Sequence, residues 1–149
     1  MKEETIIKIS ALRKHFPVKN LWGTDIALVK ALDGVDLSIC EGKTFGIVGE
    51  SGCGKTTLMR TLLRLVEPTS GSVVLSEKLT GGQFSSNNLE ELKKNELRKF
   101  RRQLGVVFQD PMGALNPRML IKDIVGEPLA IHGQTENIRD RVIELLNNV

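Results

Sequence analysis

Hydrophobic and polar residues alternate along two stretches near the start of this 149-residue chain. Apolar side chains fall on every second position from Ile7 to Ala11, and a second alternation covers residues 28–39. Such alternation puts the apolar side chains on one face and is typical of half-buried β-strands. The second stretch is interrupted by Asp33-Gly34, a dipeptide that favours a hairpin turn, and residues 17–25 are expected to form a loop.

The pattern then changes from alternating to helical. Residues 44–48 form a short apolar run that predicts a buried strand, and the leucine spacing within residues 58–66 predicts a helix that Pro68 ends. Residues 70–75 predict another short strand. The polar, glycine-rich residues 77–87 predict a loop.

The second half of the chain is expected to be mainly helical. Helical patterns cover residues 89–102, 120–131 and 136–149, and a short apolar strand is predicted at residues 104–108. The last helix carries an apolar stripe with no obvious partner, made of Ile138, Val142, Leu145 and Val149. Strands and helices together indicate the α/β class.

One segment has the pattern of a phosphate-binding loop. Residues 49–56 read Gly-Glu-Ser-Gly-Cys-Gly-Lys-Thr and stand between the predicted strand and the predicted helix, which fits G-x-x-x-x-G-K-[ST]. Glycines let successive backbone N–H groups turn toward an anion, and the helix N-terminus adds a favourable dipole. Lys55 can reach the outer phosphates, and the Thr56 hydroxyl can bind magnesium. The alternative is a glycine turn with a chance lysine, but every fixed position is filled, so the sequence predicts a nucleoside triphosphate site.

Composition argues against several other classes of protein. The 21 basic and 18 acidic residues give a net charge of +3, too small to indicate nucleic-acid binding, and the basic residues 98–102 are expected to form a solvated helix face. Cys40 and Cys53 form no metal-binding cluster and are expected to be reduced cytosolic thiols. No apolar run approaches the roughly eighteen residues of a membrane helix, so the chain is expected to be soluble, with room for a membrane-bound partner.

A second motif follows the predicted strand at residues 104–108. Residues 108–118 read Phe-Gln-Asp-Pro-Met-Gly-Ala-Leu-Asn-Pro-Arg. The amide of Gln109 both donates and accepts hydrogen bonds, so it can orient water or contact a metal, although alone it would be an ordinary polar residue at a strand end. Together with residues 49–57, this segment resembles the glutamine loop of ABC-transporter ATPase subunits, most closely those of the oligopeptide/dipeptide importer branch.

The resemblance covers essentially the whole chain and implies its fold. The expected architecture is a P-loop NTPase core of ABC type, with an antiparallel β subdomain and the start of a helical subdomain. Residues 1–116 would form the nucleotide-binding core, and residues 117–149 would begin the helical subdomain.

The resemblance also implies roles for particular residues. Residues 52–55 would wrap the β- and γ-phosphates, Thr56 would bind Mg²⁺ and Thr57 would reach the α-phosphate. Gln109 would sense the γ-phosphate through the metal or the attacking water, so Lys55 and Gln109 are the expected catalytic residues, and Thr56 and Gln109 the expected metal ligands. The expected ATP-binding set is Phe16, Gly49, Glu50, Ser51, Gly52, Cys53, Gly54, Lys55, Thr56, Thr57 and Gln109.

The adenine contact is assigned to Phe16, since the family uses an aromatic residue of the first strand for stacking on the base. Stacking needs only an aromatic face, which phenylalanine provides. Core packing is the alternative role for Phe16. His15 and Trp22 are weaker candidates and are expected to be structural or surface residues.

By the same resemblance, the protein would hydrolyse ATP to drive solute import, with oligopeptides or dipeptides as the expected cargo. Its partners would be the transporter's membrane subunits, docked near Gln109, a second ATPase subunit and, indirectly, an extracytoplasmic solute-binding protein. No nucleic-acid partner is expected. The protein would be cytoplasmic and peripheral on the inner face of the membrane.

The sequence departs from the family pattern in its second half. The signature motif, the strand ending in Asp-Glu and the switch histidine are missing, and His132 reads as a helix-end residue. Residues 79–83, Leu-Thr-Gly-Gly-Gln, look like the signature, but they precede the glutamine loop and lead into a polar loop, so the likeness is interpreted as chance. The chain is therefore interpreted as an amino-terminal fragment of an ATPase subunit, with negligible ATPase activity alone.

Two other functions remain open, and a third is disfavoured. The chain could be a short nucleotide-binding module that does not turn over ATP, or part of a soluble ABC ATPase without membrane subunits. A small-molecule kinase is disfavoured because nothing resembles a site for an acceptor substrate.

Overall fold

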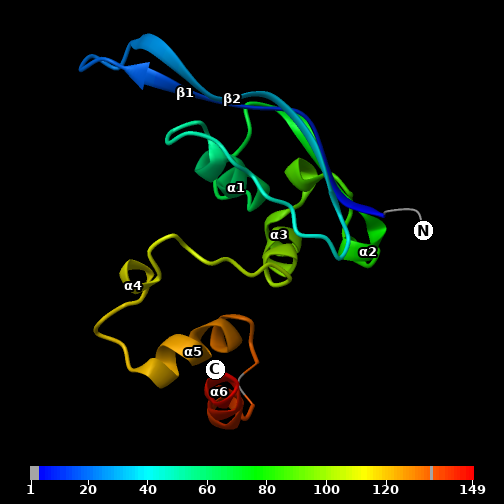
Figure 1. The fold of residues 1–149 in the computed structure, drawn as a ribbon, viewed down its shortest axis with the longest axis vertical. Helices are drawn as coiled ribbons and strands as arrows, with labels where there is room; N and C mark the ends of the chain where they lie inside the picture. The colour runs from blue at the N-terminus through cyan, green and yellow to red at the C-terminus, as the bar shows by residue number, and fades with distance from the viewer. Residues whose placement is uncertain (1–3, 135) are drawn as a thin grey trace. The chain divides into compact units, whose positions relative to one another are not determined.

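The computed structural model describes residues 4–134 and 136–149. The chain divides into two compact units, Met1–Arg101 and Arg102–Val149. The first unit contains an antiparallel sheet with helices, and the second is helical (Figure 1). No helix in the described part of the chain is long and apolar enough to span a bilayer.

The sheet has three antiparallel strands in the order β2-β1-β3. They are β1 (Thr5–Lys19), β2 (Asp25–Cys40) and β3 (Ser70–Leu75), so the predicted antiparallel sheet is confirmed. β1 and β2 are longer than expected, and their pairing extends from Thr5 opposite Cys40 to Lys19 opposite Asp25. Figure 1 shows them as a long ribbon that continues past β3.

The tip of this ribbon is a short turn. The loop predicted at residues 17–25 is wrong at its ends, because the strands pair up to Lys19 and Asp25. The Asn20 carboxamide stabilises the turn by accepting hydrogen bonds from the backbone N–H groups of Trp22 and Thr24. The Trp22 side chain is 90% exposed.

The turn predicted at Asp33-Gly34 is wrong. β2 runs straight through this dipeptide, with Arg13 opposite Asp33 and Leu12 opposite Val35, so Gly34 is an extra residue in the ladder. Its φ of 87° lies in the left-handed region, which glycine adopts without steric cost. Asp33-Gly34 therefore forms a β-bulge instead of a turn, because pairing with the long β1 strand outweighs the preference of this dipeptide for a turn.

The core of the first unit lies between the sheet and the helices that pack on it. Leu58 of α1 (Lys55–Leu62) and Phe100 of α3 (Lys94–Arg101) are buried in it. Two shorter helical segments complete the unit, α2 (Glu77–Thr80) and the 3₁₀ segment Leu89–Glu91. The other buried apolar side chains of this unit are Ile9, Leu12, Leu32, Val73, Leu75, Leu89 and Leu92.

The predicted helix bounds need three corrections in this unit. α1 ends at Leu62 rather than near Val66, and Arg64 has a positive φ of 50°, which a helix cannot continue through. The helix predicted at residues 89–102 is split into the 3₁₀ segment and α3. The loop predicted at residues 77–87 contains α2, whose first turn is capped by the Ser76 side chain.

Two predicted strands are not strands in the structure. Residues 44–48 and 104–108 have no ladder partner, and none of their apolar side chains is buried; Val48 and Val107 are 93% and 92% exposed, and the others are partly exposed. Continuous apolar runs of this kind are typical of parallel strands that are covered on both faces. Within the part of the chain that the structure describes, no neighbouring strand is available to either run.

The second unit contains α4 (Pro111–Ala114), α5 (Ile121–Ile131) and α6 (Ile138–Asn147). α5 and α6 pack together, and a Cβ placed on Gly126 of α5 would lie 3.0 Å from Cγ2 of Ile138 and 3.5 Å from Cγ2 of Val142. The first half of the apolar stripe of α6 therefore has a partner, which the sequence did not predict. Leu145 and Val149 remain exposed.

Candidate functional site

The loop at residues 49–54 joins the exposed run at 44–48 to the start of α1. Gly54 is the N-cap residue, with a left-handed φ of 101°. A Cβ at this position would lie 2.3 Å from the carbonyl oxygen of Ala31 on β2, so only glycine lets the loop pack this closely on the strand. The sheet thus fixes where the helix begins.

The Lys55 side chain is folded back over the loop. Its ammonium donates hydrogen bonds to the carbonyl oxygens of Gly49 at 2.8 Å and Glu50 at 2.6 Å. It also lies 3.4 Å from the Sγ of Cys53, which is an exposed free thiol. The loop therefore closes around a positive charge that is held by two backbone oxygens.

The N-terminus of α1 is suited to an anion. No side chain caps it, and its first turn contains no acidic residue. The backbone N–H groups at the start of a helix have no intrahelical acceptors, and the helix dipole makes this end positive. A phosphate at this position would therefore meet free N–H groups together with the Lys55 ammonium.

Thr56 fits the role of a magnesium ligand. Its side chain is exposed on the first turn of α1, and its hydroxyl has no hydrogen-bond partner among residues 4–134 and 136–149. Mg²⁺ at phosphate sites is typically held by one or two protein oxygens together with phosphate oxygens and water. The described part of the chain contains no group of three or more His, Cys, Asp or Glu side chains that could hold a metal ion by itself.

Phe16 lies on the long ribbon, opposite Val29, and its side chain is 38% exposed. The Lys14 ammonium stands 4.9 Å from the centroid of its ring. The ring is thus not fully packed in the core, and a charged group lies close to it. Part of its surface is open to a planar ligand.

His15 and Trp22 are placed differently. The Nε2 atom of His15 lies 3.3 Å from Oδ1 of Asp33, and Trp22 is at the exposed tip of the ribbon. Asp33 also binds Lys30 at 3.2 Å and lies 3.7 Å from Arg13. The hydrogen bond from Lys30, helped by the one from His15, lowers the pKa of Asp33. His15 is therefore part of a polar cluster around Asp33 and is engaged in a hydrogen bond there.

Gln109 belongs to the second unit, where it is exposed and follows residues 104–108, which form neither a helix nor a strand. The residues after it form a capped turn: Oδ1 of Asp110 accepts a hydrogen bond from the N–H of Gly113 at 3.0 Å. Oδ1 of Asn116 likewise accepts from the N–H of Arg118 at 3.0 Å. The polar residues of this motif thus shape its backbone and leave the Gln109 side chain exposed.

The signature-like residues 79–83 form the end of α2 and a turn. Thr80 is buried, and Gly81 and Gly82 have positive φ values of 57° and 65°. The next helical segment begins only at Leu89. The segment therefore does not open a helix, which agrees with its interpretation as a chance likeness.

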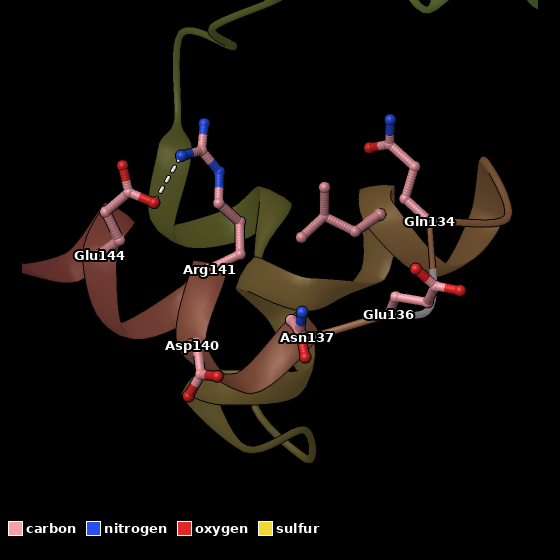
Figure 2. Close-up of a pocket in the computed structure, with 7 residues that line it drawn as sticks. Gln134, Glu136, Asn137, Asp140, Arg141 and Glu144 are labelled. Carbon is pink, nitrogen blue, oxygen red and sulfur yellow. Dashed lines mark hydrogen bonds and ion pairs between the residues drawn. The ribbon is translucent and has the colours of Figure 1, made fainter.

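A separate pocket of about 400 Å³ lies between α5 and α6 of the second unit. Figure 2 shows that acidic and amide side chains surround it, including Glu136, Asn137 and Asp140, and that Arg141 pairs with Glu144. None of the residues predicted to bind nucleotide lines it. Among the described residues, the lining includes Glu136, Asp140 and Glu144 against a single arginine, Arg141, so its net negative charge disfavours an anion.

The sequence analysis assigned no role to Lys14, whose ammonium the structure places beside the Phe16 ring. Lys14 and Phe16 are two positions apart on β1 and so share a face of the strand. Neither motif includes Lys14, so no sequence pattern singled it out.

A glycine-rich loop that opens a helix, with a lysine folded over it, defines a phosphate-binding site of the P-loop class. Residues 32–149 match the family model described as ABC transporter, and the chain belongs to that family. The resemblance to ABC-transporter ATPase subunits is therefore confirmed.

The curated relatives carry names from oligopeptide transport. The chain is 41% identical to the putative oligopeptide transport ATP-binding protein YkfD of Bacillus subtilis, over 100% of this chain and 42% of the relative. It is 37% identical to the oligopeptide transport ATP-binding protein OppF of Salmonella typhimurium, over 99% of this chain and 43% of the relative. The chain thus spans less than half the length of these relatives.

Solved structures confirm the expected fold class. The ATP-binding cassette MJ0796 in a dimeric post-hydrolysis state, bound to ADP and Pi, matches with a TM-score of 0.72 and 28% identity, over 95% of this chain and 56% of that one. A second dimeric structure of MJ0796 matches with a TM-score of 0.65 and 29% identity, over 85% and 47%. The chain has the fold of the corresponding part of an ABC cassette.

Proposed function

We propose that this chain binds ATP and forms part of an ATP-hydrolysing subunit that energises solute import, with oligopeptides or dipeptides as the cargo. The loop at residues 49–54 carries the proposal, because it presents the uncapped N-terminus of α1 and the Lys55 ammonium to one place. The names of the curated relatives support the choice of cargo.

In the structure the Lys55 ammonium is bound by carbonyl oxygens of its own loop, and in the bound state the phosphates replace these oxygens as its partners. The Lys55 ammonium moves from the carbonyl oxygens of Gly49 and Glu50 to the β- and γ-phosphates, while the N–H groups of residues 52–55 surround them. Thr57 reaches the α-phosphate. Mg²⁺, held by Thr56 and the phosphates, would neutralise charge at the γ-phosphate.

Gln109 is the second residue assigned to catalysis, together with Lys55. It orients the attacking water or contacts the metal, and it relays the state of the γ-phosphate to membrane subunits docked beside it. Residues 117–149 form the start of the helical subdomain in this assignment. A second ATPase subunit pairs with this one at the inner face of the membrane, and the dimeric MJ0796 structures support such pairing.

Phe16 provides the platform for adenine. Its partly exposed ring supports this role over core packing, and the engagement of His15 with Asp33 removes the neighbouring candidate. Aromatic stacking tolerates phenylalanine at this position.

The test is ATP binding by residues 1–149, measured by titration calorimetry. Lys55→Ala removes charge-assisted contacts, so the dissociation constant is expected to rise about tenfold or more. Lys8→Ala, an exposed residue at the other end of β1, is the matched control and should bind like the wild type. An unchanged ATP affinity for Lys55→Ala would refute the assignment of the site.

A further inference from the structure

Lys14 is a cation beside Phe16 that belongs to neither the phosphate-loop motif nor the glutamine-loop motif. Its ammonium stands 4.9 Å from the centroid of the Phe16 ring, which is a cation–π contact. The residue is half-buried. Within the part of the chain that the structure describes, no carboxylate pairs with this ammonium.

Strand pairing places Lys14 on the same face of the ribbon as the phosphate loop. Lys14 lies opposite Leu32, and residues directly opposite in an antiparallel ladder point to the same face. Leu32 faces the loop, because its Cδ2 lies 3.4 Å from where a Cβ on Gly54 would be. Phe16, two positions after Lys14 on the same strand, shares this face.

The opposite face holds the other basic residues of this region. Arg13, His15 and Lys30 all gather around Asp33. Among the four basic residues at positions 13–15 and 30, Lys14 alone faces the loop and lacks a carboxylate in the described structure. Its ammonium stands beside the Phe16 ring, and its ladder partner Leu32 approaches Gly54 of the phosphate loop.

We propose that Lys14 is a further nucleotide-binding residue, which leaves the Phe16 ring when a base stacks there and binds the phosphate nearest the ribose. A charge-assisted bond to phosphate is stronger than an exposed cation–π contact, so the exchange is favourable. The flexible four-carbon stem of lysine lets the ammonium move while the backbone stays in the ladder. This inference rests on the proposed function, because it takes the base to lie on Phe16 and the phosphates at the loop.

The experiment measures ATP affinity of residues 1–149 carrying Lys14→Met. We expect the dissociation constant to rise about five- to tenfold, the effect of losing one charged hydrogen bond. Lys30→Met is the matched control, because it removes a nearby charge from the opposite face, and it should change the affinity less than about twofold. Circular dichroism of both variants checks that the sheet is retained.

A double-mutant cycle separates phosphate binding from orientation of the ring. Lys14→Met should weaken ATP binding by a similar factor in a Phe16→Leu background, since the phosphate contact does not need the ring. If Lys14→Met has no further effect in that background, Lys14 acts only through the ring and the proposal is overturned. Wild-type affinity in Lys14→Met also overturns it.

The failure of this inference can be told from the failure of the proposed function. If the wild-type chain shows ATP binding that depends on Lys55 while Lys14→Met binds equally well, only the role of Lys14 is wrong. If no ATP binding depends on Lys55, the proposed function fails, and the inference about Lys14 fails with it.

Discussion

Replacing Gly54 by alanine should push the phosphate loop away from β2. The new Cβ would stand 2.3 Å from the Ala31 carbonyl oxygen, whereas real Cβ contacts stay beyond 3.0 Å. The residue would also have to keep a φ of 101°, which L-residues rarely adopt. The start of α1 or the strand must therefore move.

Gly52→Ala is the matched control for this perturbation. Gly52 has a positive φ of 81°, but a Cβ there would meet nothing within 4 Å. It should suffer only the conformational strain, about 1–2 kcal/mol. Gly54→Ala should add an overpacking cost of about 1–3 kcal/mol to a similar strain, because a backbone carbonyl cannot step aside as a flexible side chain does.

Urea unfolding followed by far-UV circular dichroism gives the two free energies of unfolding. Hydrogen exchange at the Leu58 amide reports the same effect locally, since this amide donates to the Gly54 carbonyl oxygen at 2.8 Å. We expect Gly54→Ala to lower the free energy of unfolding more than Gly52→Ala and to speed exchange at Leu58. Equal destabilisation by the two substitutions would refute the close packing of the loop on β2.

Two further predictions concern side chains outside the phosphate loop. Burial raises the pKa of Glu90 above its ordinary value of 4.5, although the Val73 N–H donates to its Oε1 at 2.9 Å. The folded state thus binds the proton of the Glu90 carboxyl more tightly than the unfolded state does. Protonation of Glu90 therefore adds stability below pH 4.5, and this stability is lost as the pH rises through the pKa of the folded state. Glu90→Gln keeps an acceptor for the Val73 N–H and cannot ionise, so its urea midpoint should exceed that of the wild type at neutral pH. Below pH 4.5 this advantage should disappear. A difference in urea midpoint that does not change with pH would contradict the raised pKa of Glu90. Gln83→Ala should leave ATP affinity unchanged, because Gln83 lies in the turn after α2, and a clear loss in calorimetric titration would show that residues 79–83 belong to the site.

The success of sequence-based prediction depended on how local each signal was. The phosphate loop, α5 and β3 were predicted well, because fixed glycines, helical spacing and a short apolar run after a turn signal all act over a few residues. Residues 44–48 and 104–108 were predicted as strands from their apolar character, but a strand also needs a neighbour to pair with. The turn at Asp33-Gly34 failed for the opposite reason, since pairing with β1 outweighed a local preference.

The candidate site also combines residues indicated by local patterns with residues whose position depends on strand pairing. The proposed roles of Lys55 and Thr56 follow from their positions in one motif, and the structure adds the carbonyl oxygens of Gly49 and Glu50 that the Lys55 ammonium binds. Lys14 could not be assigned from the motif, because its relation to the loop depends on which strand residue it opposes. Gln109 stays a prediction that rests on family resemblance.

The exposed tip of the β1–β2 ribbon decides which spectroscopic probes are informative. Trp22 is the only tryptophan in the chain, and its side chain is 90% exposed in the folded state. Its indole is therefore surrounded by water before unfolding as well as after it. Intrinsic emission will report little about denaturation of the sheet, but it makes the ribbon tip a ready optical marker for any molecule that comes to cover it.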